Sequence, residues 1–100
     1  MVQSTTPTFV LTLPQDIDLS EAENVYFTLQ QSGTVITKTG DQLTVSGNTA
    51  SVSLSQTDTV ALLQGTANVQ LNWTYSGGLR AASEIVKINI TKNLITGVIE

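Results

Sequence analysis

Apolar and polar residues alternate with a period of two along most of the chain. The alternation runs through residues 8–13, 24–30, 34–38, 42–46, 49–55, 67–75 and 84–91. It is typical of strands that have one buried face and one wet face. The clearest case is the face shared by Ala67, Val69, Leu71, Trp73 and Tyr75. The pattern therefore predicts an all-β fold.

Turn residues fall between these segments. Ser32-Gly33 and Gly47-Asn48 each join two of them, and the second is a two-residue hairpin connection. Gly77-Gly78 interrupts residues 68–91, the longest patterned stretch, and so predicts a long hairpin. Short strands with breaks about every 8 to 12 residues favour a sandwich. We expect an immunoglobulin-like β-sandwich of about seven strands.

Two segments lack the period of two. Residues 55–65 predict a short helical turn that crosses from one sheet to the other, capped by Ser55 or Thr57 and ended by Gly65. Residues 13–24 predict an irregular loop. Because no repeat or linker interrupts the chain, we expect a single domain over residues 1–100, with residues 92–100 as a docking arm.

The composition excludes several kinds of chemistry. The sequence contains no cysteine and no histidine, so thiolate catalysis, Ser-His-Asp catalysis and typical zinc sites have no side chains to use. We expect no enzyme, no cofactor and no small-molecule substrate. Polarity comes instead from 16 threonines and 9 serines, which suit a pleated, half-exposed surface.

The distribution of charged and apolar residues argues against nucleic acid and membranes as partners. The four basic residues are scattered, so no stripe is present to neutralise the phosphates of nucleic acid: Lys38, Arg80, Lys87 and Lys92. No run approaches the ~20 apolar residues of a membrane-spanning helix. Residues 1–9 have no basic start followed by an apolar stretch, so we expect no secretion signal.

The densest group of charges is acidic and lies in the irregular loop: Asp16, Asp18, Glu21 and Glu23. Carboxylates in a loop can hold calcium, which takes six to eight oxygen ligands. The loop lacks the glycine and the ligand spacing of an EF-hand. We therefore favour a solvated loop, in which Asp18 or Ser20 caps a turn, and predict no metal site.

The aromatic residues divide into core and surface. Trp73 is in phase with Val69 and Leu71, which favours a core position with a partner for its indole N–H; the alternative is a sugar-stacking platform. Tyr26 is out of phase with its apolar neighbours, and Arg80 follows the glycine turn. We name Tyr26 and Arg80 as candidate contact residues.

The end of the sequence carries four apolar residues, where chains usually become polar: Leu94, Ile95, Val98 and Ile99. One interpretation is a last edge strand that packs on its own domain. The other is an arm that adds to the open sheet edge of a neighbouring subunit. Both remain open at the level of sequence, and these four residues are our main candidates for an interaction site.

Several short motifs carry a resemblance. They are Thr-Pro-Thr at 6–8, Tyr26-Phe27, SVSLSQTDT at 51–59, VQLNW at 69–73, Ala81-Ala82 after the glycine turn, and Gly-Val-Ile at 97–99. With these motifs the chain resembles small proteins of bacteriophages and prophages from Gram-positive bacteria. It is similar, more loosely, to the amino-terminal immunoglobulin-like domain of phage baseplate upper proteins.

The resemblance implies a non-enzymatic structural component of the virion, such as a decoration, baseplate, tail or head-associated module. Such a component is assembled in the host cytoplasm and acts by contacts with other virion proteins or with itself, as a homo-oligomer. The alternative is a β-sandwich that binds carbohydrate or a cell surface, which predicts exposed aromatic side chains. An enzyme would need a pocket with convergent polar groups and a perturbed carboxylate.

Overall fold

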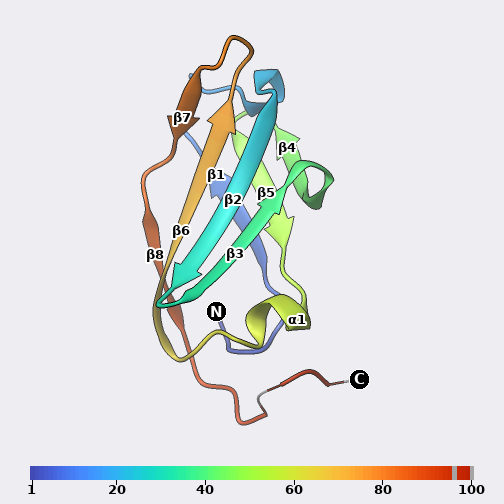
Figure 1. The fold of residues 1–100 in the computed structure, drawn as a ribbon, viewed down its shortest axis with the longest axis vertical. Coiled ribbons are helices and arrows are strands. Elements are labelled where there is room, and N and C mark those ends of the chain that lie inside the picture. The colour runs from blue at the N-terminus through green and yellow to red at the C-terminus, as the bar shows by residue number, and fades with distance from the viewer. Residues whose placement is uncertain (96, 100) are drawn as a thin grey trace.

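The alternating segments form two antiparallel sheets that face each other, so the predicted all-β sandwich is confirmed. The structure is a computed structural model, and it describes residues 1–95 and 97–99 (Figure 1). One sheet has three strands in the order β1-β5-β4. These strands are β1 (Thr8–Thr12), β5 (Thr49–Ser53) and β4 (Leu43–Ser46).

The second sheet is larger and is centred on the longest alternating segment, β6 (Gly65–Thr74). Its order is β3-β2-β6-β7, and β8 also pairs with β6. The other strands are β2 (Asn24–Gln31), β3 (Thr34–Thr39), β7 (Arg80–Ala82) and β8 (Val86–Ile90). The chain changes sheet after β1, β3 and β5, as it does in immunoglobulin-like sandwiches.

The inward faces of both sheets supply the core. Phe27, Leu29, Leu71 and Trp73 are buried on the larger sheet, and the rings of Phe9 and Phe27 lie 5.6 Å apart across the interface. The outward members of β2 and β6 are threonine, asparagine and glutamine, apart from Tyr26. Alternation therefore predicts the core-facing side of β1, β2, β4, β5, β6 and β8.

The predicted hairpin of residues 68–91 forms, but its second strand is broken. β7 pairs with residues 72–74 of β6, and β8 pairs with residues 65–69 of the same edge. Between them, Ser83 N donates to Leu71 O at 2.9 Å and Ser83 Oγ accepts from Leu71 N at 3.0 Å. The serine side chain thus takes the place of a ladder bond at the break, and the expected single strand is two.

Three short helical turns connect the strands: η1 (Leu19–Glu21), η2 (Gly40–Gln42) and α1 (Gln56–Thr59). Ser55 caps α1, as one of the two alternatives predicted, and Ser55 N donates to Asp58 Oδ2. The prediction that the helical turn ends at Gly65 is wrong, because α1 ends at Thr59 and Gly65 begins β6. Leu62 is fully buried, and the Gln31 amide bonds both Leu63 N and Leu63 O, so a side chain takes the place of helical hydrogen bonds there.

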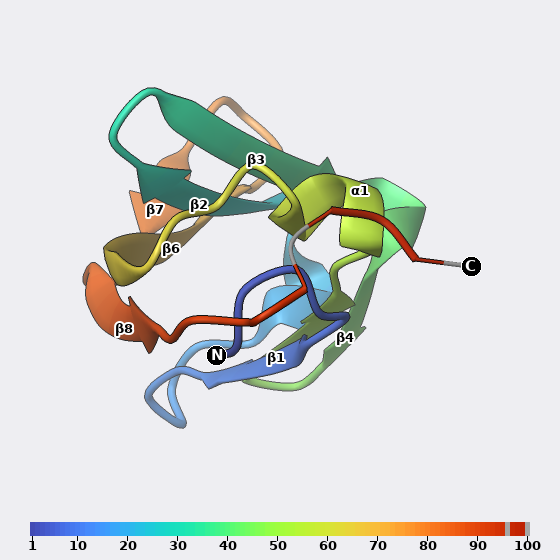
Figure 2. The ribbon, with the colours of Figure 1, turned by 90° about the horizontal axis from the view of Figure 1, so that it is seen from below.

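Seen from below, α1 closes one side of the sandwich between the two layers (Figure 2). On the other side the edge strands are β1 in one layer and β8 in the other. Residues 1–3 lie against the lower end of β8, where Val2 forms a parallel bridge with Thr91. One side of the sandwich is therefore closed by α1, whereas the other is bounded by two edge strands.

Candidate functional site

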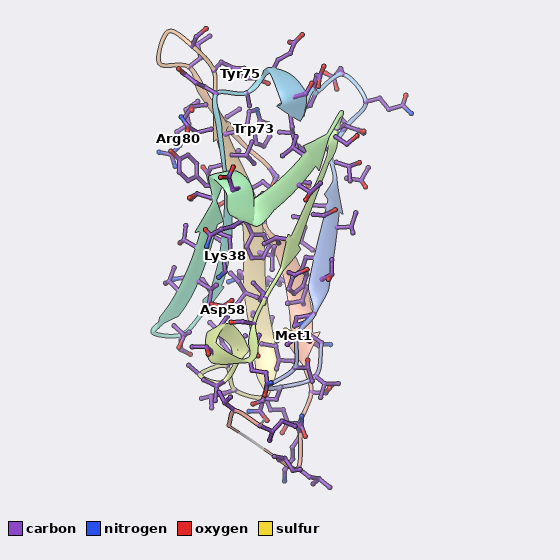
Figure 3. All side chains as sticks on the ribbon, turned by 90° about the vertical axis from the view of Figure 1, so that its right-hand side faces the viewer. Met1, Lys38, Asp58, Trp73, Tyr75 and Arg80 are labelled. Carbon is purple, nitrogen blue, oxygen red and sulfur yellow. The ribbon has the colours of Figure 1, made fainter. Side chains whose placement is uncertain are left out.

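The side closed by α1 is held by an ion pair. Lys38 Nζ on β3 lies 2.9 Å from Asp58 Oδ2 on α1, and the two side chains are 17% and 19% exposed (Figure 3). Burial by itself would raise the pKa of Asp58, but hydrogen bonds from Lys38 and Ser55 outweigh it and lower that pKa. This carboxylate accepts from the backbone N–H of the cap residue Ser55 and pairs with a lysine, so its role is structural.

Trp73 lies in the core and is 2% exposed. Its indole Nε1 donates to the hydroxyl of Tyr75 at 3.1 Å, which is the partner that its burial requires (Figure 3). The core interpretation is confirmed. The sugar-stacking alternative for this tryptophan is wrong, because its ring is covered.

The acidic loop does not gather its carboxylates. Asp18 caps η1 by accepting from Ser20 N at 3.0 Å, as predicted for a solvated loop. Within residues 1–95 and 97–99, no three acidic side chains lie close enough together to hold a metal ion. In the same part of the chain, no helix is long and apolar enough to cross a membrane.

Tyr26 and Arg80 meet on the outer face of the larger sheet. They line a shallow hollow of about 400 Å³ together with Thr28, Thr37, Asn72 and Thr74. Arg80 donates to Asn72 Oδ1 at 2.9 Å, which holds the guanidinium over the strand beside β2. The hollow therefore combines one aromatic ring, one cation and several neutral hydrogen-bonding groups.

The tail is residues 92–99, and its described residues, 92–95 and 97–99, do not pack onto the core. Leu94, Ile95, Val98 and Ile99 are between 56% and 92% exposed. The described part of the tail contains no strand, so the edge-strand interpretation fails for it. The tail crosses below the sandwich toward α1, away from the β8 edge (Figure 2).

Two side-chain amides hold the tail by its backbone. Gln56 Nε2 donates to Ile99 O at 3.0 Å, and Gln56 Oε1 accepts from Ile99 N at 2.8 Å. Near the start of the tail, Asn93 N donates to Gln3 Oε1 at 3.3 Å, and Asn93 Nδ2 donates in turn to Gln3 O at 2.9 Å. These bonds fix the path of the tail and leave its apolar side chains in solvent.

A groove that the sequence did not reveal lies on the open side of the sandwich. It has a volume of about 650 Å³ and runs between β1 and the β7–β8 edge. Its lining is mostly apolar and includes Phe9, Leu11, Trp73, Val86 and Ile88. Alternation predicts which side chains point inward, but it does not show that no strand covers them, so sequence carried no signal for the groove.

The strand order defines the class of the chain as an immunoglobulin-like β-sandwich with one open side. Comparison with models of protein families, with curated proteins and with solved structures gave no match. The tail, the hollow at Tyr26 and Arg80, and the groove are therefore the features that bear on function.

Proposed function

We propose that this chain is a non-enzymatic assembly module of a bacteriophage particle, which acts by contacts with copies of itself and with other virion proteins. The observation that carries the proposal is the tail, whose four apolar side chains lie in solvent while its backbone is held. Exposed apolar groups gathered in one segment are typical of interaction sites. The motif resemblance to phage proteins supports the setting in the virion.

The chemistry of the surfaces supports contact rather than turnover. The one shifted carboxylate among the described residues, Asp58, is committed to Lys38 and to the cap of α1. The groove is lined mainly by hydrocarbon, and the tail is apolar. Both surfaces gain free energy by being covered, since apolar area is stabilised by removal from water.

Truncation after Thr91 tests the proposal. Because the core residues precede the tail, the shortened chain should keep its β-type circular dichroism spectrum and lose self-association in light scattering. A full-length variant with Val98→Ser and Ile99→Ser should also lose association. Val35→Ser is the matched control, because Val35 and Ile99 are each 58% exposed. Equal masses for the full and shortened chains would rule out the tail as an assembly element.

The hollow at Tyr26 and Arg80 favours a second candidate, binding of carbohydrate at a cell surface. Sugars stack on aromatic rings and bond to amides and hydroxyls, and the hollow offers both kinds of group. Glycan-array binding that is lost in Tyr26→Ala and Arg80→Ala, but kept in Val35→Ser, would support this candidate. Absence of any glycan signal from the unaltered chain would remove it.

A further inference from the structure

The open groove exposes residues that face the core. Val86 lies opposite Val69 in the β6–β8 register, so both side chains are on the inward face. Val69 is 2% exposed, whereas Val86 is 52% exposed. The difference arises because nothing covers the interior at the β8 edge. The interior is therefore uncovered along the β8 edge on this side.

The edge of β1 is prepared for another strand. Pro7 O accepts from Leu54 N, and Leu13 N donates to Asn48 O. The odd-numbered residues Pro7 and Leu13 therefore direct their backbone groups toward β5. Alternate residues of an antiparallel strand direct their N–H and C=O to opposite sides. The backbone N–H and C=O groups of the even-numbered residues Thr8, Val10 and Thr12 thus point to the open edge of β1. An added strand could pair with them and close the groove.

The chain's own tail is directed away from this groove. Thr91 N donates to Met1 O at 2.8 Å and Gln3 N donates to Thr91 O at 2.9 Å, so residues 1–3 occupy the base of the β8 edge. The tail leaves below them and is held at Ile99 by Gln56. The groove and the tail of one molecule are therefore both uncovered, and contacts with two other copies can cover them.

We propose that the groove accepts residues 92–99 of a second copy as an added strand, antiparallel to β1. This inference rests on the proposed assembly function and supplies its acceptor site. Six residues of extended chain span about 20 Å, so Leu94–Ile99 matches the length of residues 8–13. Alternation in the added strand turns either Ile95 and Ile99 or Leu94 and Val98 toward the groove, so both choices bury apolar side chains.

Charge sets the direction of the added strand. Glu84 is the one charged residue among those that line the groove in the described chain, and it precedes β8 at the end away from Met1. Asp16 lies between the lining residues Pro14 and Ile17, where β1 has ended. An antiparallel tail places Lys92 at this acidic end. It also runs in the same direction as residues 1–3 and ends where they begin.

The arrangement is head to tail, because donor and acceptor are different surfaces. Such contacts produce rings if the rotation between copies closes, and open chains of subunits if it does not. The unaltered protein should therefore form a series of species larger than a dimer as its concentration rises. Sedimentation velocity distinguishes this series from a single closed dimer, which would overturn the head-to-tail arrangement.

Two complementary full-length variants test the acceptor. Val86→Asp places a charge in the groove and leaves the tail intact; the pair Leu94→Asp and Ile95→Asp disables the tail and leaves the groove intact. Each should be monomeric alone, and an equimolar mixture should form dimers and nothing larger. Ile85→Asp is the matched control, because Ile85 is 58% exposed but does not line the groove. It should associate like the unaltered chain.

Charge reversal tests the direction. Glu84→Lys should weaken association by about two- to fivefold, the usual range for an exposed ion pair, and Lys92→Glu in the partner should restore it. If association survives Val86→Asp and the mixture gives no dimer, the groove is not the acceptor, although the assembly function stands. If the unaltered chain stays monomeric at millimolar concentration, self-assembly and its acceptor both fail. Circular dichroism of every variant shows whether its fold is intact.

Discussion

Replacement of Asp58 by alanine should destabilise the sandwich, because this carboxylate joins α1 to β3. It accepts from Ser55 N at 2.9 Å and pairs with Lys38 Nζ at 2.9 Å. Loss of the hydrogen bond from Ser55 N costs about 1 kcal/mol, whereas the cap by Ser55 Oγ on the backbone N–H of residue 58 is kept. Loss of the charged partner leaves a mostly buried ammonium unpaired, which costs about 1–2 kcal/mol more. The cost of breaking this ion pair stays below the ~3–5 kcal/mol for breaking a fully buried pair, since water still reaches both side chains.

The sum, about 2–3 kcal/mol, is large for a chain of 100 residues, and should lower the melting temperature by roughly 10–20 °C. Urea unfolding followed by the fluorescence of the single tryptophan, which is buried, measures it directly. Asp41→Ala is the control, because Asp41 is an exposed acid in η2 and its loss should cost no more than about 0.5 kcal/mol. Equal losses for the two variants would refute the argument.

The same carboxylate should make stability depend on pH. The pKa of Asp58 is lowered in the folded state, so the unfolded chain binds the proton more tightly. Its stabilising contribution is therefore complete above the unfolded value of about 3.9 and is lost as the pH falls through the lower, folded pKa. The difference in unfolding free energy between the unaltered chain and Asp58→Asn should be constant from about pH 7 to 5 and shrink below about pH 4.

Two further predictions concern the core and the tail. Tyr75→Phe removes the acceptor of the buried Trp73 indole and should cost about 1–2 kcal/mol in urea unfolding, whereas Tyr26→Phe on the outer face should cost almost nothing. Gln56→Ala releases the Ile99 backbone and should strengthen self-association, because the restrained tail competes with its docking on another copy. Gln64→Ala, at an exposed glutamine outside this contact, should leave association unchanged in light scattering; weaker association of Gln56→Ala would show that the restraint prepares the tail for docking.

Side-chain amides of glutamine and asparagine connect segments that are far apart in the sequence. Gln31 bonds both backbone groups of Leu63, Gln56 bonds both of Ile99, and Asn48 bonds the carbonyl of Leu13. An amide offers one donor and one acceptor side by side, so it can pair with an extended backbone as a neighbouring strand does. This use of glutamine and asparagine fits a sequence in which only 12% of residues are charged.

Local patterns in the sequence determined the strands, their turns and their inward faces. Val69, Leu71 and Trp73 are buried as their period of two requires, and Ser55 caps the one α-helix of the described chain. These features depend on residues close together in the sequence, whose backbone geometry fixes which side chains share a face. They could therefore be predicted without knowledge of which strands are neighbours.

Tertiary structure alone decided how the surfaces are arranged. It brought Tyr26 and Arg80 into one hollow, paired Lys38 with Asp58, broke the second strand of the hairpin at Ser83, and left Val86 exposed on an inward face. Each of these results depends on contacts between segments far apart in the chain. A periodic pattern records which side of a strand avoids water, but whether another strand covers that side is settled only when both sheets are assembled.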